Sequence, residues 1–391
     1  MLFVTSGTWA TIFVLAPLAK AARNAGHEVF VTTRDDAVHV VTGLGLPAVS
    51  VTSLKLRDFV YKDRSGKPLK PPEHDRPAEA MTYTGRWFGR MAAGTLDRHL
   101  ELAANWRPDI VVGGKNSYAA PLLAAHLEIP FVRHNWDASE VALMDEAANE
   151  ELRPELSRLD LDRLPLPDLF VEIIPPSLRL AETLPAKATQ AMRWIPCNLT
   201  TRVEPWMYTR DGRPRVCVTA GSTPSTGTAP KGQPDGGRRF YELLRRLVMA
   251  IAPLEVDLLV GAPDAAAASL RDELGCARAA WLPMDVVAPT CDVIVHPAGG
   301  QTSLTALTSG VPQLLVPQGV PILGPALRMS DYGAAITLPP GDDSVGQIAD
   351  ACQELLHDPA YKKRADELSH EIAALPPPAE VVDVLEDLVG G

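Results

Sequence analysis

The chain has 391 residues, of which 46% are hydrophobic and 22% are charged, an ordinary globular composition that excludes a disordered or fibrous chain. At about 150 residues per domain, this length predicts two or three domains. The net charge of −11 argues against binding to a nucleic acid backbone. The sequence has no run of about 18 apolar residues, so we expect no membrane span.

Cysteine usage indicates the compartment. Five cysteines lie far apart without a C-x-x-C pair: Cys197, Cys217, Cys276, Cys291 and Cys352. Such a set is typical of a reduced cytoplasmic protein without a cysteine-bound zinc ion. The first ten residues, MLFVTSGTWA, lack the basic and apolar regions of a secretory signal. We therefore expect a cytoplasmic protein, and we expect no metal.

The N-terminal half alternates short apolar strands with helices. Strands that alternate with helices pair in parallel, which predicts a doubly wound α/β sheet. The predicted strands are 2–6, 28–33, 109–114 and 130–136, with helices from about 8 to Gly26 and over 117–127.

Two polar segments interrupt this alternation. Segment 53–85 is rich in Lys, Arg, Asp and Pro, and we expect a mobile loop there. Segment 150–177 is polar and broken by prolines, and segment 194–214 has turn formers without a clear period. We interpret 194–214 as the connection between two domains.

A second α/β series follows this connection. Its predicted strands are 215–221, 255–261, 292–300 and 312–318, with terminal helices near 344–357, 360–374 and 379–389. The pattern predicts two Rossmann-like doubly wound domains that face a cleft. The predicted boundaries are residues 1–200 and 214–360 for the domains, 201–213 for the linker, and 361–391 for C-terminal helices that pack back on the first domain.

The most informative stretch is 292–304, DVIVHPAGGQTSL. A buried strand ends at His296, Gly299 and Gly300 turn the chain, and a helix opens at Thr302 or Ser303. A helix N-terminus at the carboxyl edge of a parallel sheet favours an anion, usually a phosphate. The alternative is a purely structural turn in which His296 contacts no ligand. No Lys follows as in a P-loop, which argues against ATP hydrolysis.

This region resembles the donor site of family 1 glycosyltransferases, most closely the bacterial branch that attaches deoxysugars to antibiotics. The resemblance is carried by Trp281-Leu-Pro, His296, Gly299, Thr302, Gly310-Val-Pro-Gln313 and Pro317-Gln318, in the family's order. It implies the GT-B fold, with the acceptor on domain 1–200 and the nucleotide sugar on domain 214–360. Segments 192–198 and 204–210 are most similar to enzymes that attach D-olivose to angucycline polyketides.

The resemblance also implies roles for individual residues. Trp281 and Leu282 would contact the nucleobase, although a core aromatic remains an alternative for Trp281. The residues implied at the diphosphate are Ser222, His296, Gly299, Gly300, Gln301 and Thr302.

One departure from the family concerns the sugar. Where relatives carry an acidic residue and Gln that bind sugar hydroxyls, this chain has Pro321 and Ile322. Since an unpaired buried polar group costs about 1–3 kcal/mol, an apolar site suits a sugar that lacks hydroxyls. This predicts a dTDP-2,6-dideoxyhexose donor such as dTDP-D-olivose. The alternative is a loop insertion that displaces the alignment.

A second departure concerns the catalytic base. Many relatives have a His after the first strand, but here Ser6, Thr8 and Trp9 lie among residues that include no His or carboxylate. The segment RHNWD (133–137) ends another strand at the same edge, so we predict Asp137 as the base and His134 as the alternative. Asp137 could instead cap the helix that follows. The residues expected to line the acceptor site are Ser6, Thr8, Trp9, His134, Trp136 and Asp137.

The predicted function is an inverting glycosyltransferase that moves a dideoxyhexose from dTDP to an aromatic polyketide, an angucycline. It would require no metal or other cofactor, because the helix dipole, backbone N–H groups and His296 would stabilise the diphosphate. The sequence leaves open whether the new bond is C–O or C–C and whether the protein is a homodimer. A two-domain oxidoreductase is disfavoured because SGTWAT (6–11) lacks the dinucleotide fingerprint. A non-catalytic nucleotide-sugar-binding protein remains an alternative.

Overall fold

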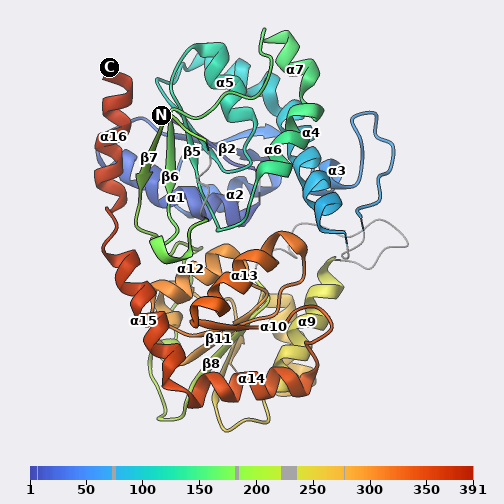
Figure 1. Cartoon of the computed structure of the whole chain (residues 1–391), viewed down its shortest axis with the longest axis vertical. Helices are drawn as coiled ribbons and strands as arrows, with labels where there is room; N and C mark the ends of the chain where they lie inside the picture. The colour runs from blue at the N-terminus through green and yellow to red at the C-terminus, as the bar shows by residue number, and fades with distance from the viewer. Residues whose placement is uncertain (7, 73–75, 181–184, 222–235, 277, 391) are drawn as a thin grey trace.

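Two parallel sheets, one in each half of the chain, form two stacked lobes (Figure 1). The computed structural model describes residues 1–6, 8–72, 76–180, 185–221, 236–276 and 278–390. Among these residues, no helix is long and apolar enough to cross a membrane. The predicted pair of doubly wound α/β domains is confirmed by the two sheets.

The first sheet has seven strands in the order β3-β2-β1-β4-β5-β6-β7. The strand order reverses between β1 and β4, and open sheets bind ligands beside such a point, at their carboxyl edge. The strands are β1 (Leu2–Val4), β2 (Phe30–Arg34), β3 (Ala48–Thr52), β4 (Val111–Gly114), β5 (Phe131–His134), β6 (Leu169–Glu172) and β7 (Ala188–Ala191).

Helices cover both faces of this sheet, and the central strands are buried because their residues are apolar on both sides. These helices are α1 (Trp9–Asn24), α2 (Val38–Gly43), α3 (Leu56–Val60), α4 (Pro77–Asn105), α5 (Ala119–Leu127), α6 (Ala142–Glu151) and α7 (Arg153–Arg158).

Segment 53–85, expected to be a mobile loop, is helical in part. It contains α3, and the 29-residue helix α4 begins within it at Pro77. Arg64 fixes the intervening turn, because its guanidinium donates to Glu151 Oε1 at 2.9 Å and to Glu155 Oε1 at 2.9 Å. The stretch 150–177 likewise contains α7 and β6.

The second sheet has six strands in the order β10-β9-β8-β11-β12-β13. Its strands are β8 (Arg215–Thr219), β9 (Asp257–Gly261), β10 (Ala279–Ala280), β11 (Val293–His296), β12 (Gln313–Leu315) and β13 (Ala335–Thr337). The helices are α8 (Pro205–Tyr208), α9 (Gly236–Ile251), α10 (Asp264–Leu274), α11 (Met284–Val287), α12 (Gly300–Thr308), α13 (Val320–Tyr332), α14 (Val345–His357), α15 (Pro359–Ala373) and α16 (Pro378–Gly390).

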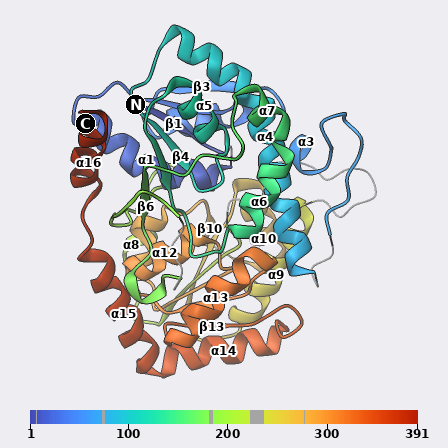
Figure 2. The same ribbon diagram turned by 45° about the horizontal axis from the view of Figure 1, so that its top comes forward.

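The C-terminal helix α16 returns to the first lobe (Figures 1 and 2). Its buried residues Val382 and Leu385 share a hydrophobic cluster with Ile12 of α1. His27 Nε2 also lies 2.7 Å from Glu386 Oε1. The same cluster includes Leu304 of α12 and Met329 of α13, so one continuous core joins the two lobes.

Candidate active site

The turn between β11 and α12 presents a helix N-terminus to the space between the lobes. Ala298 in this turn adopts φ 61°, a left-handed conformation that costs a non-glycine residue about 1–2 kcal/mol. Gly299 is the N-cap and α12 begins at Gly300, two or three residues before the predicted start at Thr302 or Ser303. No side chain among the described residues caps this end. Its first backbone N–H groups therefore lack helical partners and can bind an anion.

A cavity of about 80 Å³ lies beside this helix end, between the lobes. It brings together four of the predicted donor-site residues, Trp281, Leu282, Gln301 and Thr302. The other lining residues come from both lobes and from the connection: Phe13, Cys197, Asn198, Thr219, Gly221, Gly261, Ala262, Pro263, Met284 and Thr305. Ser222 lies outside the described residues.

Trp281 links the two lobes at this cavity. Its ring packs edge-on against Trp9 of α1, with centroids 6.0 Å apart and planes at 68°. Its Nε1 donates to the Leu199 carbonyl at 3.4 Å. Trp281 is half-buried, whereas Leu282 is 4% exposed and belongs to the core of the second lobe. Both residues line the cavity, and Leu282 is the more deeply buried of the two.

His296 is fully buried at the end of β11. Its Nε2 donates to Gln313 Oε1 at 2.8 Å, and its Nδ1 has no partner among the described residues. Burial lowers the pKa of His296 to about 4, so the ring is neutral near pH 7. The hydrogen bond from His296 to a diphosphate stays a prediction, for which Nδ1 is the ring nitrogen without a partner among the described residues, and the backbone N–H groups at the start of α12 are further donors.

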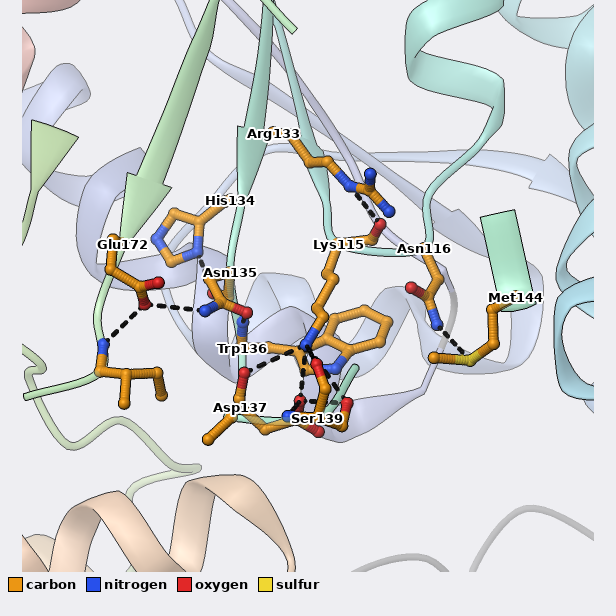
Figure 3. A network of polar contacts seen from close by, with 12 residues as sticks. Lys115, Asn116, Arg133, His134, Asn135, Trp136, Asp137, Ser139, Met144 and Glu172 are labelled. Atoms are coloured by element: carbon orange, nitrogen blue, oxygen red, sulfur yellow. Dashed lines mark hydrogen bonds and ion pairs between the residues drawn. The ribbon is translucent and has the colours of Figure 1, made fainter. Parts of the chain in front are cut away.

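Asp137 lies at the carboxyl edge of the first sheet, where its half-buried side chain forms an ion pair with the buried Lys115 (Figure 3). Its Oδ1 accepts hydrogen bonds from Lys115 Nζ at 2.9 Å, the Ser139 amide at 2.9 Å and Ser139 Oγ at 2.6 Å. Among the described residues, its Oδ2 has no hydrogen-bond donor. One carboxylate oxygen is thus fixed and the other is available.

The environment of Asp137 keeps it ionised. Burial alone would raise the pKa of Asp137, but the Lys115 charge and hydrogen bonds from Ser139 and Lys115 outweigh burial and lower the pKa. The alternative that Asp137 caps the next helix is wrong. Helix α6 begins at Ala142 and has Val141 as its N-cap residue. Asp137 instead closes a turn with Ser139.

His134 does not reach the same space. It is fully buried, its Nδ1 donates to the Asn135 carbonyl at 2.5 Å, and burial lowers its pKa to about 4. Figure 3 shows its ring on the side of β5 near Glu172, away from the Lys115 ammonium. The Nε2 of His134 has no partner among the described residues, and its role as base or acceptor contact stays a prediction.

The remaining predicted acceptor residues surround the carboxyl edge of the first sheet. Ser6 is 2% exposed and its Oγ has no partner among the described residues. Thr8 is the N-cap of α1 and accepts the Thr11 amide at 3.3 Å. Trp9 and Trp136 are half-buried, and Trp136 packs against Phe88 with ring centroids 6.0 Å apart.

A second, smaller cavity of about 30 Å³ joins the predicted base to the predicted sugar site. Asp137 contributes from the first lobe, and Gly300 and Ile322 contribute from the second. Pro321 and Ile322 are half-buried in the first turn of α13. Of the two, Ile322 lines the cavity that Asp137 also lines, and their role in binding the sugar stays a prediction.

The structure adds residues that the sequence did not indicate. Lys115, directly after β4, is 2% exposed and pairs with Asp137. Arg328 of α13 donates to the Ala138 carbonyl across the lobes. For Lys115, the signal available in the sequence was a lysine at the carboxyl end of a buried strand. Within the described ranges, His, Cys, Asp and Glu side chains form no group of three or more that could hold a metal ion.

Comparison with known proteins agrees with this architecture. Models of the N- and C-terminal domains of erythromycin biosynthesis protein CIII-like proteins match residues 20–221 and 245–388. The L-demethylnoviosyl transferase of Streptomyces niveus is 30% identical over 96% of this chain and 94% of its own. The aclacinomycin-T 2-deoxy-L-fucose transferase of Streptomyces galilaeus is 27% identical over 99% of this chain and 96% of its own.

A solved structure shows the same fold. The glycosyltransferase SsfS6 of Streptomyces sp. SF2575, complexed with thymidine diphosphate, has a TM-score of 0.84 and 30% identity over 99% of each chain. Two facing Rossmann-like lobes of this kind define a glycosyltransferase of the GT-B fold, which confirms the predicted fold and class. The chain belongs to the erythromycin biosynthesis protein CIII-like family of antibiotic-biosynthesis glycosyltransferases.

Proposed function

We propose that this glycosyltransferase takes a dTDP-2,6-dideoxyhexose as its donor and binds it between the lobes. The observation that carries the proposal is the uncapped N-terminus of α12 beside a cavity that Trp281 and Thr302 line. Backbone N–H groups and the helix dipole there would stabilise the departing diphosphate without a metal. The complex of SsfS6 with thymidine diphosphate supports a thymidine nucleotide.

We infer the class of the donor sugar from the residues in the first turn of α13. Pro321 and Ile322 offer no hydrogen-bond partner through their side chains, and Ile322 lines the small cavity beside Asp137. A sugar hydroxyl buried against them would lose its bonds to water without replacement, which costs about 1–3 kcal/mol. The 2-deoxy-L-fucose transferase among the relatives supports a dideoxy donor. We infer D-olivose as the sugar.

The acceptor is proposed to be an aromatic polyketide of the angucycline type, bound against the first lobe. Asp137 would take the phenol proton through its available Oδ2. The phenolate oxygen, or its ortho carbon, would then attack the anomeric carbon from the face opposite the diphosphate, and dTDP would leave with inversion. Both nucleophiles arise from one phenolate, so the orientation of the acceptor decides between a C–O and a C–C bond.

The test is a transfer assay with purified protein. dTDP-D-olivose, dTDP-glucose and UDP-glucose are each incubated with an angucyclinone, and the product linkage is determined by NMR. We expect an olivosylated product with dTDP-D-olivose and at least about tenfold lower kcat/KM with the two glucosyl donors. Binding of dTDP without turnover of any donor would support the non-catalytic alternative. Equal rates with dTDP-glucose and dTDP-D-olivose would contradict the assignment of the sugar.

A further inference from the structure

Lys115 is a buried cation whose hydrogen bonds are all directed at one loop. Its side chain is 1% exposed. Its Nζ lies 2.9 Å from Asp137 Oδ1, 3.1 Å from the Asp137 carbonyl, 2.5 Å from the Ser139 carbonyl and 3.2 Å from Ser139 Oγ. An ammonium group has three N–H donors, so these four oxygens use its whole capacity. Lys115 therefore cannot bind a substrate directly.

The contacts of Lys115 determine where Asp137 lies. Figure 3 shows the ammonium reaching from β4 to the loop after β5, so it ties together the carboxyl ends of two neighbouring strands. Together with Ser139 it occupies Oδ1 of Asp137 and leaves Oδ2 without a donor among the described residues. The carboxylate is thus held by one oxygen in a fixed orientation.

The second lobe closes against this same loop. A Cβ built on Gly300 would lie 2.6 Å from Asp137 Cβ, so the backbone of α12 approaches Asp137 directly. Arg328 of α13 donates to the Ala138 carbonyl. The loop that Lys115 holds is therefore the surface of the first lobe that meets the helix end proposed to bind the diphosphate.

We propose that Lys115 is the positioning residue of the reaction, because it orients Asp137 toward the acceptor and keeps the carboxylate ionised. The inference rests on the proposed role of Asp137. Arg328 from α13 also interacts with the charge of Asp137, and it interacts with Glu140 of the same loop. Arg328 donates to a backbone carbonyl in this loop, and the ion pair of Asp137 is with Lys115.

The test compares the pH dependence of kcat from pH 6 to 9 in the wild type and Lys115→Met. Without the ammonium, burial favours protonated Asp137, which cannot accept a proton. We expect the variant to lose about tenfold or more in kcat at pH 6 relative to pH 9, while the wild type changes by less than about threefold. The double variant Lys115→Met/Asp137→Asn should instead follow the pH dependence of Asp137→Asn alone, because no carboxylate remains there to titrate and only the phenol does.

Two controls separate positioning from folding. Lys187→Met removes the same charge from an ion pair with Asp168 at 2.7 Å, where Lys187 is 72% exposed, and should leave the pH profile unchanged. Binding of dTDP by Lys115→Met should stay within about twofold of the wild type, because Lys115 does not line the cavity beside Trp281. A variant whose kcat falls equally at all pH values, or not at all, overturns the proposal.

A direct titration covers the case in which Lys115→Met does not fold. Carboxylate carbons labelled with ¹³C are followed by NMR in the wild type, and the Asp137 signal is the one that Asp137→Asn lacks. Asp137 should remain ionised from pH 5 to 9, and a titration within that range overturns the proposal. If the wild type transfers no sugar at all, the proposed function fails, yet this titration still decides whether Asp137 is ionised at its place beside Lys115.

Discussion

The contact between Gly300 and Asp137 can be tested by adding one methyl group. In Gly300→Ala the new Cβ would lie 2.6 Å from Asp137 Cβ and 2.9 Å from the Trp136 carbonyl oxygen. Carbon atoms pack at about 3.5–4.0 Å, and these partners are a backbone atom and a Cβ, which cannot rotate away. We expect the lobes to move apart, at a cost of about 1–3 kcal/mol typical of overpacking.

A matched control isolates this contact. Gly346 lies in the first turn of α14, and a Cβ there meets nothing within 4 Å. Ala in place of Gly stabilises a helix by up to about 1 kcal/mol, so Gly346→Ala should raise the free energy of unfolding. Gly300→Ala should lower it, although both changes improve the helix propensity equally.

The assays are urea unfolding and transfer kinetics. Because the clash separates Asp137 from α12, Gly300→Ala should also reduce kcat/KM by about 10²-fold, the loss expected for a displacement of about 1 Å between reacting groups. If both variants have the same free energy of unfolding within about 0.5 kcal/mol and the same kcat/KM, the two lobes do not meet at Gly300 during catalysis.

Three further predictions concern other groups. Asp137→Asn should lower kcat by about 10²–10⁴-fold at neutral pH, with recovery toward pH 10 as the phenol ionises by itself, measured in parallel with the wild type. Ile322→Gln should narrow the preference for a dideoxy donor over dTDP-glucose, measured as the ratio of kcat/KM values. Acid should destabilise the fold, because burial lowers the pKa of His99, His134 and His296 to about 4 while unfolded His titrates near 6.5. Each histidine then lowers the free energy of unfolding by up to about 1.4 kcal/mol per pH unit as the pH falls from 6.5 toward 4. Urea unfolding at pH 7.5 and 5.5 measures this loss. In His99→Gln, the free energy of unfolding should depend less on pH.

The sequence predicted the part of the site that is built from one strand, the turn after it and the next helix. The buried strand and the two glycines in 292–304 located β11 and α12, and the motif residues Trp281, Gln301 and Thr302 line one cavity. These features are local, so spacing along the chain is sufficient to find them.

Other parts depend on contacts between distant residues. The burial of His296 depends on Gln313 of the neighbouring strand, and no local pattern indicates which way a side chain at a strand end turns. Lys115 and Asp137 lie 22 positions apart in the sequence and meet only because β4 and β5 are neighbours. Because Lys115 follows two glycines, the sequence alone predicts a loop residue there, and only its partner Asp137 shows its role. Strand β7 was missed because ATQA (188–191) has no apolar alternation and lies at the edge of the sheet.

The return of α16 to the first lobe has a consequence for building hybrid enzymes. The chain passes between the lobes twice, first over the segment between β7 and β8 and again between α15 and α16. The last 13-residue helix is therefore a structural part of the lobe that begins the chain, with Val382 and Leu385 packed beside Ile12. A chimera that exchanges acceptor lobes by a single crossover in the linker would pair α1 of one enzyme with α16 of another. A second crossover before Pro378 would keep that interface within one parent.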